Sequence, residues 1–328
     1  QNRRKMQYLP PKITIEGHTD LAFSEDVAAR FAGLGWHVLT VEDANDVAAL
    51  DAALASFHAC QDRPTLIVVR SVIGYGSPNK ANSHEAHGAP LGDEEIRLTK
   101  RAYGWPEDQQ FLVPDGVREH FAEGVGARGR QLHADWATKF ALYEATHPQL
   151  AADLKRIWTR ELPNGWDKDI PVFPADAKGV ASRVSSGQVL NAVAKNVPWL
   201  IGGSADLAPS NNTMLKVDKA GHFSAKDHGG RNLHFGIREH GMAAICNGLA
   251  LSGLRPFGGT FFVFTDYMRP SMRLAAIMHQ PVLYVLTHDS IGLGEDGPTH
   301  QPVEHLAACR AIPGLLVFRP GDANEVAE

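Results

Sequence analysis

Short apolar runs alternate with amphipathic stretches in the first seventy residues. The apolar spacing over 26–34 predicts a helix that Gly35 ends, and 36–41 reads as a strand. Residues 46–60 are rich in alanine and predict a second helix. The uninterrupted apolar run 65–70 is typical of a strand buried on both faces of a parallel sheet. Strand, helix and strand at this spacing predict an open α/β sheet.

The flanking segments follow other patterns. The first eleven residues begin polar and basic and end in two prolines, and they predict neither a helix nor a strand. A loop rich in Gly, Ser, Asn and His is expected over 71–92, and charged helices are expected over 94–165. Dense Pro, Gly and Asp over 163–174 indicate a linker.

The remaining chain repeats the α/β pattern, which predicts a second domain of the same class. Its expected helices cover 185–195, 238–251, 261–278 and a start near Asp322. Its expected strands cover 199–203, 233–235, 282–287 and 315–318. Pro270 is expected to kink the helix over 261–278.

Length and composition fit a chain of two ordinary globular domains. The 328 residues are 44% hydrophobic and 21% charged. A net charge of −5 argues against nucleic acid or an anionic membrane surface as the main partner. Three scattered cysteines favour a reducing compartment. Because the chain shows no signal-peptide pattern and no apolar run of membrane length, a cytoplasmic protein is expected.

The strongest chemical signal lies in residues 288–302, a loop-like segment with three glycines and two prolines. It places His288, Asp296 and His300 just after the apolar run 281–286, where an open α/β sheet binds its ligands. A surface loop with incidental histidines and a metal site are the alternatives. The metal site is disfavoured because these spacings across Gly-Pro turns do not define a tetrahedral geometry.

Two further patterns admit a functional and a structural interpretation. Glu239 falls in the first turn of an expected helix, where a carboxylate either interacts with the helix dipole or bonds a cofactor. Phe261, Phe264 and Tyr267 recur every three residues and would share one helix face. Such a stripe usually packs into a core, but it can also stack on a flat heterocycle.

Two polar loops follow expected strands. Residues 74–90 carry His84 and His87, and residues 202–211 carry Ser204, Asp206 and Ser210. On these residues alone, a solvated connection is the simpler interpretation of both loops. Arg183 precedes an expected helix and would be a phosphate clamp only if it lay near a pocket.

Taken together, these motifs resemble those of transketolases over residues 12–328. The segments 288–302 and 202–211 are specific to that family, whereas other thiamine diphosphate enzymes share only the general plan. The resemblance implies two open parallel-sheet domains of the thiamine diphosphate-binding type, both incomplete, joined by a helical linker. The later part of a diphosphate-binding domain would cover 1–148, the linker 149–176, and a pyrimidine-binding domain truncated at its C-terminal end 177–328. A homodimer with its active site at the subunit interface is also implied.

The resemblance also implies cofactor roles. Glu239 would hold the aminopyrimidine ring nitrogen, so that the exocyclic amine can remove the thiazolium proton and form the ylide. The remaining expected cofactor contacts come from aromatic, acidic and aliphatic side chains: Phe261, Phe264, Tyr267, Asp206, Leu207, His87 and Ile15.

Substrate roles follow in the same way from the resemblance. His87 and His300 would contact the reacting carbonyl and hydroxyls and move protons, while Asp296 would accept a bond from a substrate hydroxyl. Arg183, Ser210 and His288 would grip a sugar phosphate. The implied reaction transfers a two-carbon ketol unit from a ketose phosphate to an aldose phosphate, as in the pentose phosphate pathway.

The chain departs from the family at its metal site. It contains no Gly-Asp-Gly segment, and Pro11 stands where the family has a ligating Asn. Only the backbone carbonyl of Ile13 is left to ligate Mg²⁺ or Ca²⁺, which need several oxygens. We therefore expect an internal segment of a transketolase that does not bind thiamine diphosphate tightly by itself. The alternative is a non-catalytic or split half-subunit that needs a partner chain.

Overall fold

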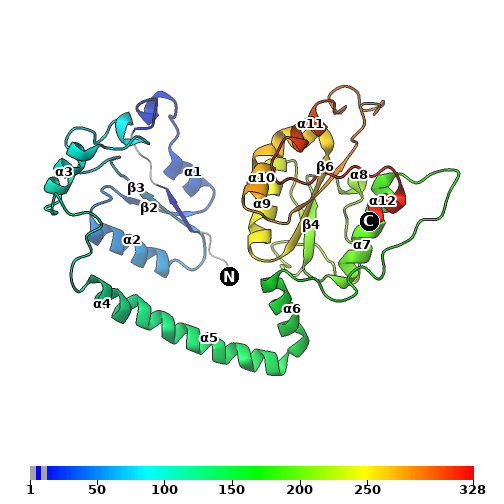
Figure 1. The fold of residues 1–328 in the computed structure, drawn as a ribbon, viewed down its shortest axis with the longest axis horizontal. Helices are drawn as coiled ribbons and strands as arrows, with labels where there is room; N and C mark the ends of the chain where they lie inside the picture. Colours follow the sequence, from blue (N-terminus) through cyan, green and yellow to red (C-terminus); the bar gives the residue numbers. More distant parts are fainter. Residues whose placement is uncertain (1–4, 9–12) are drawn as a thin grey trace. The chain divides into compact units, whose positions relative to one another are not determined.

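The computed structural model describes residues 5–8 and 13–328, with the side chains described from residue 13 onward. The chain divides into two compact units, residues 1–126 and 127–328. Each unit contains its own parallel sheet with helices packed on it (Figure 1). The α/β class expected from the sequence is confirmed, and each unit is described by itself below.

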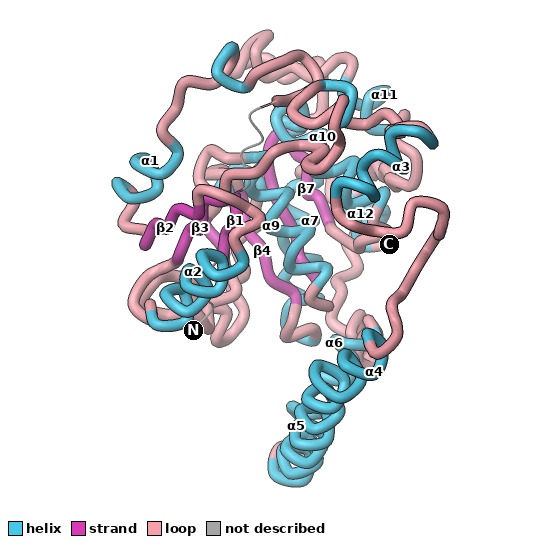
Figure 2. The backbone as a smooth tube through the Cα atoms, turned by 90° about the vertical axis from the view of Figure 1, so that its left-hand side faces the viewer, coloured by secondary structure: helices cyan, strands magenta, loops and turns pink. Residues whose placement is uncertain are grey.

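The first unit contains a three-stranded parallel sheet in the order β1-β3-β2 (Figure 2). Its strands are β1 (Lys5–Tyr8), β2 (His37–Val41) and β3 (Thr65–Val69). Helices α1 (Val27–Gly33) and α2 (Val47–Ala59) begin at aspartate caps, because the carboxylates of Asp26 and Asp46 accept backbone amide bonds at the helix starts. The expectation that the first eleven residues form no strand is wrong. Residues 5–8 form an edge strand that pairs with β3. The backbone hydrogen bonds between paired strands do not require apolar side chains, so the polar sequence did not reveal this strand.

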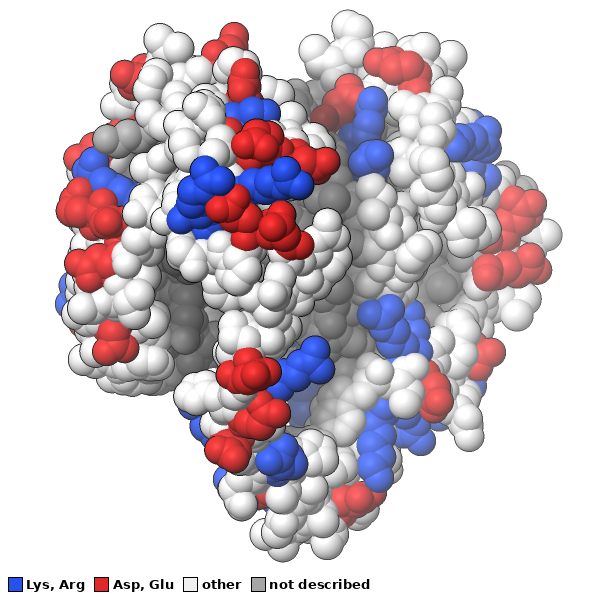
Figure 3. All heavy atoms as spheres, turned by 60° about the vertical axis from the view of Figure 1, so that its left-hand side comes forward, with Lys and Arg blue, Asp and Glu red and all other residues white. Residues whose placement is uncertain are grey.

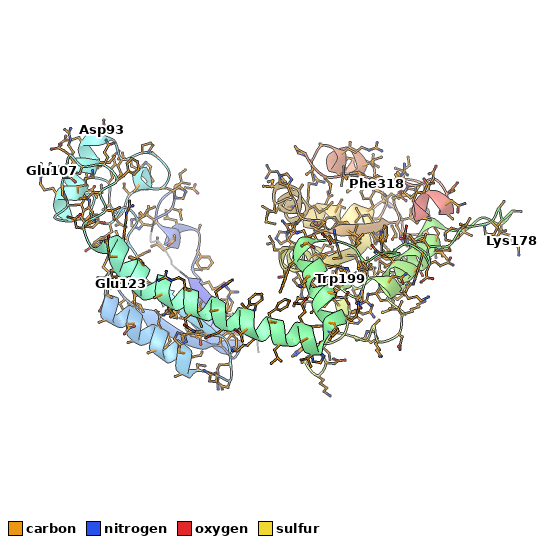
Figure 4. The ribbon with its side chains drawn as sticks, turned by 60° about the horizontal axis from the view of Figure 1, so that its bottom comes forward. Asp93, Glu107, Glu123, Lys178, Trp199 and Phe318 are labelled. Carbon is orange, nitrogen blue, oxygen red and sulfur yellow. The ribbon has the colours of Figure 1, made fainter. Side chains whose placement is uncertain are left out.

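A long loop with the short 3₁₀ turn η2 (His84–Ala86) follows β3 and leads to α3 (Asp93–Ala102). The buried carboxylate of Glu95 holds this loop. It accepts bonds from the Ser77 hydroxyl and from the backbone and side-chain amides of Asn79, the latter two at 2.9 and 2.8 Å. Figure 4 labels Asp93, the first residue of α3, and Glu107, which lies in the segment after this helix.

The helical region expected over 94–165 is interrupted between 103 and 116. It contains, in order, α3, α4 (Val117–Phe121), the π-helical segment η3 (Ala122–Gly126), α5 (Ala127–Thr146) and α6 (Pro148–Thr159). In the second unit, α5 and α6 are joined by an aromatic contact in which Trp136 stacks on Phe140 at 5.2 Å and both rings meet Trp158.

The second unit contains a four-stranded parallel sheet in the order β5-β4-β6-β7. Its strands are β4 (Leu200–Ser204), β5 (Asn232–His234), β6 (Arg255–Phe261) and β7 (Leu283–Thr287). Its helices after α6 are α7 (Ser182–Asn196), α8 (Ala208–Asn211), α9 (Glu239–Leu251), α10 (Thr265–Ile277), α11 (His305–Arg310) and α12 (Ala323–Ala327). Helices α9 and α10 lie together on one side of this sheet, and α7 with α12 on the other (Figure 1).

Two apolar clusters fill the second unit. Phe257 belongs to the cluster beside α7. Trp199, labelled in Figure 4, belongs to the same cluster. Met242 and Cys246 are fully buried in the cluster beside α9 and α10. The glycines of β4 have a steric reason, because a Cβ on Gly203 would come within 1.8 Å of the Leu233 carbonyl oxygen.

Two sequence expectations fail in the second unit. Residues 261–278 are not one helix, since Phe261 ends β6, the 3₁₀ turn η4 (Phe262–Phe264) follows, and α10 then continues through Pro270. The cause is pairing, because β6 lies between β4 and β7 and Phe261 is in register with Thr287. Residues 315–318 alternate between core and solvent as a strand would, yet within the described sheets no strand pairs with them. Phe318, labelled in Figure 4, is 83% exposed.

Among the described residues, no helix is long and apolar enough to cross a membrane. Acidic and basic side chains are mixed over the face shown in Figure 3, and neither sign dominates it.

Candidate active site

The parallel strands of the second unit bring four side chains to one edge of its sheet. Ser204, His234, Phe261 and Thr287 are the last residues of β4, β5, β6 and β7. Because the strands run parallel, their carboxyl ends lie together, and loops at this edge can converge on a ligand.

An aromatic cluster forms at this edge from Phe261, Phe264, Tyr267, His288 and His300. The Phe261 and Phe264 rings stack at 5.8 Å, and the Tyr267 ring follows Phe264 at 6.0 Å. His300 meets both phenylalanines edge-on, at 6.0 and 5.3 Å. The three aromatic residues predicted from the sequence therefore do meet, although a strand end, a 3₁₀ turn and a helix present them rather than one helix face.

His288 lies at the centre of the polar part of this edge. Its ring stacks on Phe261 with centroids 3.8 Å apart, and its Nε2 lies 3.3 Å from Nη1 of Arg183. Its backbone is in the left-handed region, with φ at 55°, which is uncommon for a non-glycine residue and typical of functional sites. Residues 183 and 288, far apart in sequence, thus form a pair that can face an anion.

The charge state of His288 follows from these neighbours. Burial lowers the pKa of His288 below its usual value, and the positive charges of Arg183 and His300 lower it further. The carboxylates of Asp296 and Asp289 act in the opposite direction without reversing the shift. His288 is therefore neutral at pH 7, and Asp296 is close enough to act on it electrostatically.

The segment that carries Asp296 and His300 is tethered at both ends. Asp289 accepts from Nε of Arg319 at 2.7 Å, and His305 Nε2 lies 3.1 Å from Oδ2 of Asp266 on α10. Between these tethers Asp296 is exposed and His300 is half-buried. The loop therefore has fixed ends and an accessible polar middle.

Buried polar side chains connect the strand ends behind His288. The Ser204 hydroxyl lies 2.8 Å from Oδ1 of Asn211. Asn211 Nδ2 donates to the Thr287 hydroxyl at 2.6 Å, and that hydroxyl lies 2.9 Å from Nδ1 of His288. The sequence interpretation missed Asn211 and Thr287. The available signal was a polar residue at the end of the apolar run before His288 and an Asn at the end of the 202–211 segment.

Glu239 is the first residue of α9 and is only 6% exposed. Within the described part of the chain, no hydrogen bond reaches its carboxylate. A ligand that donates a hydrogen bond to this carboxylate would therefore be favourable. A ligand with an N–H or a protonated ring nitrogen matches this position.

The loop after β4 places Asp206, Leu207 and Ser210 beside the same edge. Asp206 has a φ of 66° and is exposed, while the Leu207 amide donates to the Ser204 hydroxyl at 3.0 Å. Ser210 lies in the short helix α8 and is half-buried. Of these three residues, Leu207 is bonded to the buried Ser204 hydroxyl, which is linked through Asn211 and Thr287 to His288.

Three predicted residues belong to the first unit. His87 caps η2 and has an exposed side chain, and Ile15 is 69% exposed. The Ile13 carbonyl receives no hydrogen bond from the described residues, so it is free to ligate a cation. Pro11, the position where an Asn ligand was expected, lies outside the described residues.

The described residues do not form a complete metal site. Their one group of three convergent ligand atoms is Asp266, Glu304 and His305. There Asp266 already bonds the Arg269 guanidinium at 2.5 Å, which supplies the positive charge that a metal would bring. His288, Asp296 and His300 do not form such a group, and no carboxylate cluster accompanies Ile13 in the part described.

Two family models cover nearly the whole chain. The transketolase thiamine diphosphate binding domain matches residues 6–163, and the transketolase pyrimidine binding domain matches residues 178–328. The chain belongs to the transketolase family. Transketolase from Geobacillus stearothermophilus is 53% identical over 316 residues, which are 96% of this chain and 47% of that protein. Chloroplastic transketolase-1 of Arabidopsis thaliana is 52% identical over 318 residues, which are 96% of this chain and 42% of that protein.

Solved transketolases have the same fold. The Pichia stipitis transketolase in complex with sedoheptulose 7-phosphate superposes with a TM-score of 0.91 at 42% identity, covering 98% of this chain and 48% of that one. The Leishmania mexicana transketolase superposes with a TM-score of 0.91 at 40% identity, covering the same shares. This transketolase-family chain thus spans about half the length of the relatives that it matches.

The family fits the geometry of the second unit. A thiamine diphosphate cofactor presents a flat aminopyrimidine, and the largely buried Glu239 side chain accepts no hydrogen bond from the described residues. The aromatic cluster offers ring faces for stacking. For the metal, by contrast, the described residues do not suffice.

Proposed function

We propose that this chain acts in a ketol transferase reaction that moves a two-carbon unit from a ketose phosphate to an aldose phosphate. The observation that carries the proposal is the pairing of Arg183 with His288 at the strand edge that also holds the aromatic cluster. A phosphate grip beside stacked rings suits a reaction in which a sugar phosphate meets a heterocyclic cofactor.

Glu239 holds the pyrimidine part of the cofactor by accepting and sharing a proton at a ring nitrogen. Phe261, Phe264 and Tyr267 pack against the ring, with Asp206 and Leu207 beside them. His87 and Ile15 add contacts from the first unit. When bound, thiamine diphosphate supplies a nucleophilic thiazolium carbon and an electron sink for breaking the ketose carbon–carbon bond.

The polar residues of the site bind two parts of the sugar phosphate, its phosphate group and its sugar oxygens. Arg183, Ser210 and His288 bind the phosphate, with His288 neutral because burial and Arg183 lower its pKa. Asp296 accepts from a substrate hydroxyl, which favours one stereochemistry. His300, edge-on to the two phenylalanines, and His87 contact the reacting oxygens and move protons at them.

The metal and the assembly complete the proposal. Mg²⁺ or Ca²⁺ would bind the diphosphate with the Ile13 carbonyl as one ligand, but the described residues do not complete the site. The protein acts as a homodimer with its active site at the subunit interface.

The direct test is transfer from xylulose 5-phosphate to ribose 5-phosphate by the natural protein that carries this chain, with thiamine diphosphate and Mg²⁺. Formation of sedoheptulose 7-phosphate is expected, and its loss on Glu239→Gln would assign the activity to this site. No transfer by a folded, cofactor-saturated protein would overturn the proposal.

The incomplete metal site favours one second candidate, a half-subunit that works only with a partner chain. Titration calorimetry of the 328-residue chain with thiamine diphosphate and Mg²⁺ should then show no sub-micromolar binding. Stoichiometric sub-micromolar binding would remove this candidate. Transfer that begins only when a partner chain is added would favour it.

A further inference from the structure

A line of three buried polar side chains ends at His288. Ser204, Asn211 and Thr287 are 4%, 0% and 9% exposed and come from β4, α8 and β7. Their links measure 2.8 Å between Ser204 and Asn211, 2.6 Å between Asn211 and Thr287, and 2.9 Å between Thr287 and Nδ1 of His288. Buried polar groups are retained only when they are bonded, and these bonds lead to a site residue.

The orientation of the Asn211 amide favours one position for the imidazole proton. The Ser204 hydroxyl lies near two acceptors, Oδ1 of Asn211 at 2.8 Å and the Gly259 carbonyl oxygen at 2.9 Å, and can donate its one proton to either. The amide nitrogen of Asn211 is turned toward Thr287 and donates to its hydroxyl oxygen. The single hydroxyl proton of Thr287 is then free to point at Nδ1 of His288. A neutral imidazole that accepts at Nδ1 carries its proton on Nε2.

That proton faces the Arg183 side chain. Nε2 of His288 and Nη1 of Arg183 lie 3.3 Å apart, and both are donors when His288 has this tautomer. Two adjacent donors are satisfied together by the oxygens of one anion. With the opposite tautomer Nε2 would accept from Arg183, and the imidazole would have no N–H for an anion.

We propose that Asn211 and Thr287 are positioning residues that hold His288 in its Nε2–H tautomer, so that His288 and Arg183 donate together to a phosphoryl group. This inference rests on the phosphate role given to His288 in the proposed function and deepens it. Neither positioning residue touches the phosphate. A role limited to joining β4, α8 and β7 would not depend on the tautomer.

The test uses ¹⁵N-histidine NMR of the natural protein that carries this chain, at pH 7 and titrated with inorganic phosphate, with His288 assigned from the spectrum of His288→Gln. The wild-type chain should show the Nε2–H pattern at His288, and phosphate should shift its signals. Thr287→Val should mix the two tautomers and weaken phosphate binding about three- to tenfold, the effect of losing one hydrogen bond. Thr287→Ser keeps the hydroxyl and should restore both readouts.

Thr213→Val is the matched control. Thr213 is 1% exposed in the same unit and its hydroxyl has no partner among the described residues, so its removal should leave tautomer and phosphate binding unchanged. An Nδ1–H tautomer at His288 in the phosphate-bound wild type would overturn the proposal, even if Thr287→Val does not fold. An unchanged tautomer in folded Thr287→Val, or no response of His288 to phosphate, would overturn it too.

The two hypotheses fail separately. An Nε2–H tautomer with phosphate binding, in a protein that transfers no ketol unit, would reject the proposed function and leave the positioning role standing. Ketol transfer with the Nδ1–H tautomer would do the reverse.

Discussion

The imidazole of His288 lies flat on the phenyl ring of Phe261, with centroids 3.8 Å apart and planes inclined by 28°. Phe261 is the last residue of β6, and His288 directly follows the neighbouring strand β7. The register that pairs Phe261 with Thr287 brings the two rings together. The buried ring of Phe261 therefore supports the imidazole of His288, so a change in core packing at Phe261 would also change the geometry of the site.

Replacing Phe261 should affect both stability and the orientation of His288. Phe261→Ala removes a ring that is 7% exposed and should cost about 3–5 kcal/mol in the free energy of unfolding. Tyr267→Ala, at a position 64% exposed, should cost less than about 1 kcal/mol. Urea denaturation of both variants measures the difference, and equal losses would contradict the assigned burial.

Removing the charge of Arg183 should raise the pKa of His288. Burial is the largest cause that lowers this pKa, and the positive charge of Arg183 is the second largest. Arg183→Met removes this charge and keeps an unbranched side chain. An NMR pH titration of His288 measures the shift. Arg273→Met, which changes an exposed arginine of the same unit, is the control, and an equal pKa in both variants would show that Arg183 does not act on His288.

Glu239→Gln should separate stability from activity. Because the Glu239 carboxylate has no hydrogen-bond partner among the described residues, neutral Gln should leave the melting temperature unchanged or raise it. In the natural protein the same change should lower kcat about 10²- to 10⁴-fold, since a proton-sharing group is lost. A large drop in melting temperature would show that Glu239 has a structural partner.

The hydrogen bonds from Ser77 and Asn79 to the Glu95 carboxylate should make the stability of the first unit sensitive to acid. Bonds from Ser77 and Asn79 lower the pKa of Glu95 to about 2 from its usual value of 4.5. A carboxyl with a lowered folded pKa stabilises the fold fully above the unfolded value, and this stability is lost as pH falls from about 4.5 towards 2.

Urea denaturation at pH 6, 4 and 3 tests this sensitivity. Glu95→Gln should be less stable than wild type at pH 6. The difference in the free energy of unfolding between the two proteins should become smaller as the pH falls. Glu94→Gln, at a side chain 75% exposed, is the control and should follow the wild type. If the difference in free energy of unfolding between Glu95→Gln and wild type does not change with pH, the charge of the Glu95 carboxylate does not contribute to stability.

The cysteines should differ in reactivity. Cys246 is fully buried, and burial raises the pKa of its thiol to about 12, so it should react with a thiol reagent only after unfolding. Cys60 is partly exposed and should react first in the native chain. Cys60→Ser should therefore remove the rapid labelling phase, and rapid labelling that persists in this variant would contradict the burial of Cys246 and Cys309.

The elements whose signals are local were predictable. Helices α2 and α9 and strand β3 match their expected ranges within a few residues, because side-chain periodicity acts over one or two turns and α2 also begins at an Asp cap. Strand β1 and the strand character of Phe261 were missed, because both depend on ladder bonds to segments distant in sequence. The strand expected over 315–318 has the right alternation but no pairing partner among the described strands.

The sequence by itself determined the α/β class, the chemistry at His288, Asp296 and His300, and the resemblance that led to the transketolase family. Only the tertiary structure decided that Arg183 stands at His288, and that Asn211 and Thr287 connect His288 to the strand ends. The reason is physical. Residue type and spacing limit what a side chain can do, but parallel pairing of distant strands decides which side chains meet at the sheet edge.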